Sequence, residues 1–71
     1  MVLAAARPGK AVRIQAINAG RGLQARLAAL GMTPGVEVEV IAGGASGPCI
    51  VALRNSRIAL GRGMAGKIIV G

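Results

Sequence analysis

The sequence predicts a small, mainly β domain: a barrel of five to six short strands with one short α-helix. The chain has 71 residues, enough for a single domain, residues 1–71, built on one shared core. More than half of the residues are hydrophobic, and twelve glycines divide them into short runs, which is typical of short strands. The chain has no Phe, Tyr or Trp, so aliphatic side chains and Met must fill the core.

Two Pro-Gly turns indicate where the first two strands begin. Pro presets the backbone at the second position of a type II turn, and Gly accepts the positive φ of the third position. The structural turn residues that we expect are Pro8, Gly9, Pro34 and Gly35. The strands that follow the two turns are expected at residues 11–17 and 36–42.

Apolar and polar residues alternate in both segments with the period of two that marks a half-buried strand. In the first segment, the positions expected to face the core are Val12, Ile14 and Ala16. In the second segment, the expected inward positions are Val36, Val38 and Val40, and the outward ones are Glu37 and Glu39. Each strand should therefore bury one side.

Residues 22–30 change to the period of an α-helix. Its apolar stripe consists of Leu23, Leu27 and Leu30. We expect at least two of these leucines to face the core. Gly31 should end the helix in the left-handed conformation, and Pro34 prevents the helix from resuming. The opposite side of the helix carries alanines instead of charges.

The second half of the chain should complete the sheet with strands at residues 49–53, 58–60 and 67–70. The glycine-rich residues 43–47 lack the Lys-Ser or Lys-Thr of a phosphate-binding loop and are expected to be a plain hairpin connection. A turn is expected at residues 54–57, where Asn55 tolerates the left-handed conformation, and a tight connection at 61–66. A sheet of short strands that curls into a barrel leaves few exposed edges. We therefore expect an SH3-like barrel with the helix across one opening.

The charge balance restricts the class of partner. Nine Lys or Arg residues and two Glu give a net charge of +7, which favours an acidic surface. The basic residues are spread along the chain, and no aromatic side chain is present to stack on bases. A protein partner is therefore favoured over nucleic acid, and a small nucleic-acid-binding barrel stays as the alternative. The chain has neither the roughly 20 apolar residues of a membrane-spanning helix nor a leader pattern, so we expect a cytoplasmic protein.

The residue types argue against catalysis, cofactor binding and metal binding. The chain has no His and no Asp, and Cys49 has no acid-base partner in the sequence, so no catalytic residue is expected. Ferrous sites usually combine imidazole with carboxylate ligands, and Glu37 and Glu39 are the only carboxylate side chains. We expect both to be solvated on the outside of the barrel. Cys49 begins an apolar run, where a small buried side chain is the ordinary interpretation.

In the order of these features the chain resembles the FeoA family, the small accessory proteins of the ferrous iron transporter FeoB. The residues that carry the resemblance are Leu3, Pro8, Gly9, Ile14, residues 26–35, Val38, Val40, Gly47, Pro48, residues 58–60, Ala65 and residues 68–70. The most specific part is residues 26–35, where a leucine helix, a glycine cap and a Pro-Gly turn follow one another at fixed spacing.

This resemblance implies an SH3-like domain without enzymatic activity or cofactor. It also implies docking on the cytoplasmic part of FeoB, so that contact with the membrane is only through the transporter. The same domain occurs at the end of some iron-dependent repressors. A detached repressor module is therefore a further alternative, although the chain has no helical DNA-binding segment.

The helix is the surface expected to contact a partner. Its alanine side, together with a basic rim, offers a close-fitting apolar patch. The expected contact residues are Arg21, Arg26, Leu27, Ala28 and Met32.

Overall fold

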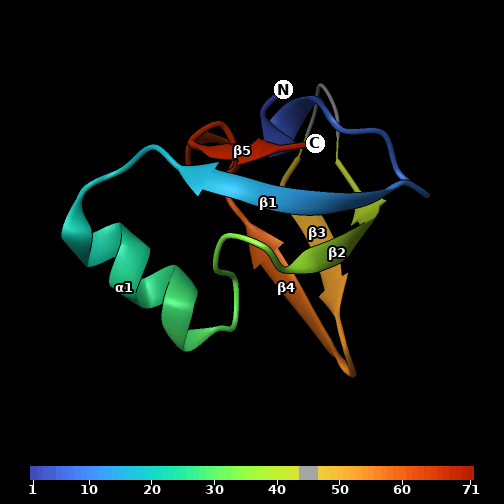
Figure 1. Cartoon of the computed structure of the whole chain (residues 1–71). Helices are drawn as coiled ribbons and strands as arrows, with labels where there is room; N and C mark the ends of the chain where they lie inside the picture. Colours follow the sequence, from blue (N-terminus) through green and yellow to red (C-terminus); the bar gives the residue numbers. More distant parts are fainter. Residues whose placement is uncertain (44–46) are drawn as a thin grey trace.

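The computed structural model describes residues 1–43 and 47–71 and shows a five-stranded antiparallel sheet with one helix beside it (Figure 1). In chain order the elements are the 3-10 helix η1 (Leu3–Ala5), β1 (Ala11–Ile17), α1 (Arg21–Ala29), β2 (Glu37–Ala42), β3 (Cys49–Leu53), β4 (Ser56–Leu60), α2 (Arg62–Ala65) and β5 (Ile68–Val70). The mainly β fold class with one short helix is confirmed. The single-turn helices η1 and α2 were not predicted. In the described part, no helix is long and apolar enough to cross a membrane.

The strands follow the order β4-β3-β2-β1-β5, and each neighbouring pair is antiparallel. Figure 1 shows a strongly curved sheet in which β1 runs across the direction of β3 and β4. The connection predicted at residues 43–47 joins the neighbouring strands β2 and β3, and its residues 44–46 lie outside the described part. The turn between β3 and β4 is tighter than expected, because Leu53 already pairs with Ser56. Strand β4 therefore begins two residues before the predicted start.

The alternation predicted for β2 is confirmed at four positions, because Val38 and Val40 are buried and both glutamates are exposed. Val36, also predicted to face inward, precedes the strand and is half-buried against the core. The same prediction is wrong at one position of β1. Val12 and Ile14 are buried, whereas Ala16 is exposed. The pairing of β1 with β5 shifts between Ile14 and Ala16, and such a bulge moves the following side chains relative to the sheet.

The core is aliphatic throughout, as the composition requires. Its largest fully buried side chains are Leu3, Ile14, Leu27, Met32, Val38, Val40, Val51, Leu60, Ile68 and Val70. Cys49 is also buried, which confirms its interpretation as a small core residue. No polar side chain is buried in residues 1–43 and 47–71. The domain is therefore held together by aliphatic packing and by the sheet.

The predicted turn glycines adopt the conformation that their positions require. The φ angles are 89° for Gly9, 89° for Gly31 and 95° for Gly35. In the β3–β4 turn, however, the left-handed residue is Arg54, with a φ of 56°, and not Asn55. A two-residue hairpin that pairs Leu53 with Ser56 requires positive φ at its first central position, so the short turn places the strain on Arg54.

Candidate functional site

Hydrogen bonds define both ends of helix α1. At its start, the Gln24 side chain amide donates to the carbonyl oxygens of Ala19 and Ile17, at 2.7 and 3.3 Å. At its end, the N–H of Gly31 donates to the Ala28 carbonyl and the N–H of Met32 to the Leu27 carbonyl, each at 2.9 Å. These two bonds form a Schellman motif, the usual way in which a left-handed glycine ends a helix.

The Schellman motif also explains which of the predicted contact residues are buried. The motif brings together an apolar side chain of the last helical turn and the one that follows the glycine. Here these are Leu27 and Met32, which are 1% and 0% exposed. The prediction that Leu27 and Met32 contact a partner is therefore wrong, because both belong to the core. Arg21, Arg26 and Ala28 are exposed.

The leucine stripe of α1 divides between core and surface. Leu27 lies in the core and Leu23 packs against it, as expected for at least two of the three leucines. Leu30 is 50% exposed, since it follows the last residue of the helix and the chain turns away there. Figure 1 shows α1 beside the sheet, so most of its surface faces solvent. We call six exposed residues of α1 and its C-cap the α1 surface: Arg21, Ala25, Arg26, Ala28, Ala29 and Leu30.

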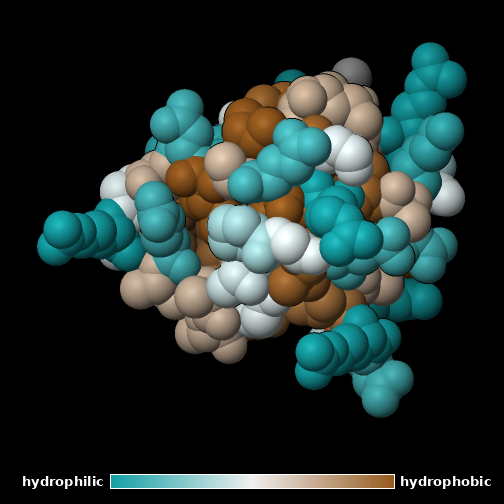
Figure 2. All heavy atoms as spheres, in the orientation of Figure 1, coloured by the Kyte–Doolittle hydropathy of each residue, from teal (hydrophilic) through white to brown (hydrophobic). Residues whose placement is uncertain are grey.

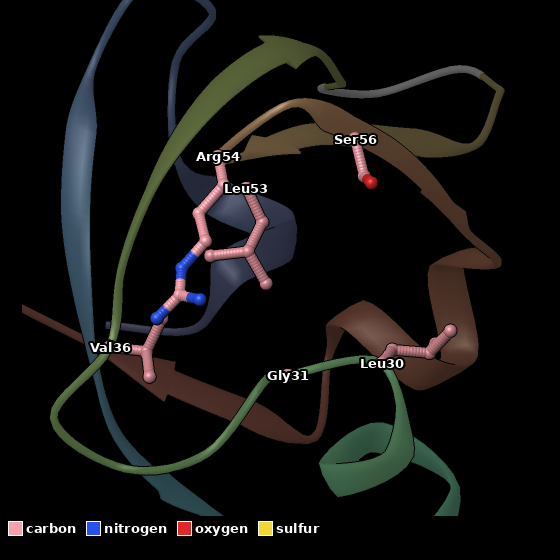
Figure 3. A pocket seen from close by; sticks show the side chains of 6 residues that line it. All are labelled: Leu30, Gly31, Val36, Leu53, Arg54 and Ser56. Carbon is pink, nitrogen blue, oxygen red and sulfur yellow. The ribbon is translucent and has the colours of Figure 1, made fainter.

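A hollow of about 230 Å³ lies between the end of α1 and the β3–β4 turn (Figure 3). The residues that line it are Leu30, Gly31, Val36, Leu53, Arg54 and Ser56. Figure 3 shows Leu53 pointing into the hollow and the Arg54 side chain reaching across toward Val36. Sequence reasoning missed this hollow, because two separate stretches of the chain, residues 30–36 and 53–56, form it.

The charged side chains are spread over the face of the molecule that Figure 2 shows. In Figure 2 the hydrophilic side chains project at separate points, and apolar surface is visible between them. Both glutamates lie on the outer side of β2, where Glu37 pairs with Arg13 of β1. The Arg13 guanidinium also donates to the Gly35 carbonyl at 2.8 Å. No carboxylate side chain follows Glu39 in residues 40–71.

The possible metal ligands and nucleophiles are kept apart. In the described ranges, no three side chains of His, Cys, Asp or Glu come together. Glu37 and Glu39 face solvent, whereas Cys49 lies in the core. Burial raises the pKa of the Cys49 thiol above its ordinary value, so the thiol stays protonated near neutral pH and is a poor nucleophile or ligand.

Comparisons with known proteins agree with one another. The FeoA domain family model matches residues 1–71. A protein of Methanocaldococcus jannaschii named putative Fe(2+) transport protein A is 41% identical over 68 residues, which cover 96% of this chain and 82% of that protein.

Two solved structures extend this similarity to the fold. A crystal structure of an iron uptake regulatory protein, FeoA, is 30% identical and has a TM-score of 0.90, with 99% of this chain and 93% of that chain covered. FeoA of Stenotrophomonas maltophilia, solved in complex with zinc and described as an SH3 domain protein, is 26% identical and has a TM-score of 0.84, with 100% and 89% covered. These similarities confirm the predicted SH3-like fold.

Proposed function

Because this chain belongs to the FeoA domain family, we propose that it is a non-enzymatic accessory protein that docks on the cytoplasmic region of a FeoB-type ferrous iron transporter and modulates it. The family match over the whole chain and the name of the Methanocaldococcus relative support a role in ferrous iron transport. The Stenotrophomonas protein is described as a candidate activating factor of such transport, which supports modulation as the role. The proposal places the chain in the cytoplasm, in contact with the membrane only through the transporter.

The observation that carries this proposal is the α1 surface. Ala25, Ala28 and Ala29 leave the helix backbone open to close approach, and Leu30 adds a large exposed apolar side chain. Arg21 and Arg26 are exposed on the same helix and add positive charge beside the alanines. An apolar centre with a charged rim is the usual composition of a protein interface, and the arginines favour an acidic partner surface.

A direct binding measurement tests the proposal. The full chain is titrated into the purified cytoplasmic region of the FeoB transporter from the same organism, and heat or fluorescence anisotropy reports association. We expect saturable binding that weakens as salt is raised, because the arginine charges are screened. A chain that folds normally and shows no association, with or without guanine nucleotide on the transporter, would contradict the proposed function.

A further inference from the structure

Strand β4 is an open edge of the sheet. The opposite edge strand, β5, is covered by the start of the chain, because Val70 donates to the Met1 carbonyl at 2.8 Å and Val2 forms a bridge with Ile69. Within residues 1–43 and 47–71, β4 has only β3 as a neighbour. Its exposed residues include Arg57 and Ala59, so its outer side is accessible.

The register of the hairpin shows which peptide groups are free. In an antiparallel ladder closed by a two-residue turn, the pair beside the turn is hydrogen-bonded, and bonded and non-bonded pairs then alternate. Here Leu53 and Ser56 are the pair beside the turn, so Arg57 and Ala59 occupy non-bonded positions. Their N–H and C=O groups point away from β3, at the spacing that an added strand requires.

The edge strand itself is basic. Arg57 lies within β4 and Arg62 follows it, and both are exposed, whereas the exposed Arg54 before β4 reaches toward Val36. Arg57 pairs with Ala52 of β3, and Ala52 pairs in turn with Glu39 of β2, so the nearest carboxylate in this row lies two strands away. Arg57 therefore has no carboxylate as its direct cross-strand partner, and its outer side is open to an acidic side chain.

We propose that the β4 edge binds an extended segment of another protein in which acidic and apolar side chains alternate. On an added strand, successive side chains point to opposite sides of the sheet. Those on the outer side meet Arg57, which favours Asp or Glu. Those on the inner side meet Ile58, which is half-buried and packs against the core, and this position favours an apolar side chain.

A second copy of this chain does not fit the same edge. Pairing β4 with β4 would bring together two segments that each carry Arg54, Arg57 and Arg62 and no acidic residue, and like charges across a ladder are destabilising. The occupant is therefore a different, acidic chain. This inference goes beyond the proposed function, because it involves neither the α1 surface nor the transporter.

A synthetic peptide in which four glutamates alternate with four valines tests the proposal. Amide hydrogen exchange is followed by NMR on the full chain with and without the peptide. We expect the amides of Arg57 and Ala59 to become protected, and the affinity to fall as salt is raised. A peptide of alternating lysine and valine should not bind. Protection confined to residues outside β4 would overturn the proposal.

Three variants sharpen this test. Ala59→Pro removes an outward N–H that the β3 ladder does not use, so the fold should persist while peptide affinity falls at least about tenfold. Arg57→Glu should abolish binding of the glutamate peptide and create binding of the lysine peptide, which keeps the test decisive if the proline variant fails to fold. The matched control Arg7→Glu makes the same charge change at an exposed residue before β1 and should leave affinity within about twofold.

Two results would reject the proposal. One is full peptide affinity in a folded Ala59→Pro protein. The other is a single-stranded oligonucleotide that protects the β4 amides at lower concentration than the peptide, because this result would assign the edge to nucleic acid. Neither result depends on the transporter titration, so the two hypotheses fail separately.

Discussion

Gly31 is the residue at which the helix, the turn and the core meet. Its φ of 89° lies in the left-handed region, and a Cβ at this position would lie 3.0 Å from the Leu53 Cδ2 atom. A side chain would therefore meet both backbone strain and a core contact. Gly22, inside α1, has neither restriction, since a Cβ there would meet no atom within 4 Å outside its own stretch of helix and its φ is not in that region.

The two glycines give opposite predictions for the same substitution. Gly31→Ala should lower the free energy of unfolding by at least about 1 kcal/mol, and Gly31→Val by more, because the β-branched side chain adds crowding. Gly22→Ala should raise it by about 0.5–1 kcal/mol, since alanine favours the helix. Urea unfolding of the variants measures both. Equal effects at the two positions would contradict this description of the cap.

Cys49 should make the stability of the domain depend on pH in the alkaline range. Burial raises the pKa of its thiol, so the unfolded chain, with an ordinary thiol pKa of about 8.5, ionises first. The contribution of Cys49 to stability is complete below that pH and is lost as the pH rises through the folded-state pKa. Urea midpoints measured across this range should fall more steeply for the wild type than for Cys49→Ala. Parallel curves would show that the thiol is not protected by burial.

Within α1, Leu27 is the one fully buried side chain, and Leu23 packs against the core beside it. Leu27 is 1% exposed and belongs to the core, whereas Leu30, three residues later, is 50% exposed. Leu27→Ala should therefore cost about 2–5 kcal/mol of stability, the usual range for a buried leucine. Leu30→Ala should change stability by less than about 1 kcal/mol. Denaturant unfolding measures the pair, and similar costs would mean that α1 does not pack as described.

The sequence predicted the strands well, because their signals are local. Pro-Gly turns and the period-two pattern placed β1 and β2 within one residue of their observed bounds. The exposure of Ala16 could not be predicted, because the bulge depends on how β1 pairs with β5, a strand more than fifty residues away. Helix α2 was missed because four residues are too few to show a helical period.

The candidate site was predictable only in part. The exposed alanine side of α1 follows from the helical period, and Arg21, Arg26 and Ala28 are exposed as expected. Leu27 and Met32 were misassigned because the Schellman motif turns both toward the core, and this depends on three-dimensional geometry. The hollow beside Leu30 joins separate segments of the chain. The free edge of β4 depends on the order of the strands in the sheet. Neither feature leaves a local pattern in the sequence.

At the scale of the whole molecule, folding should not require metal. The core is aliphatic, and the described residues form no cluster of three possible ligands, so we expect the fold to depend on aliphatic packing and not on a bound metal. Thermal unfolding should therefore have the same midpoint with ferrous iron, with a chelator and with neither, under anaerobic conditions. A midpoint that rises by several degrees with ferrous iron would show a site that this structure does not explain.

Ala28 is the position that tests whether the α1 surface docks on the transporter. Ala28→Glu changes an exposed residue, so stability should change by about 0.5 kcal/mol or less. In an interface, the same glutamate becomes an unpaired charge and should weaken binding substantially. The matched control Ala5→Glu places the same charge on η1, where the alanine is also exposed, and should bind as the wild type does.

The most direct measurement is therefore the affinity of three proteins, the wild type, Ala28→Glu and Ala5→Glu, for the cytoplasmic region of the transporter, with urea unfolding as the check on folding. We predict that Ala28→Glu folds normally and binds at least about tenfold more weakly, while Ala5→Glu is unchanged. A folded Ala28→Glu protein that binds with full affinity would contradict the claim that the α1 surface is the docking site.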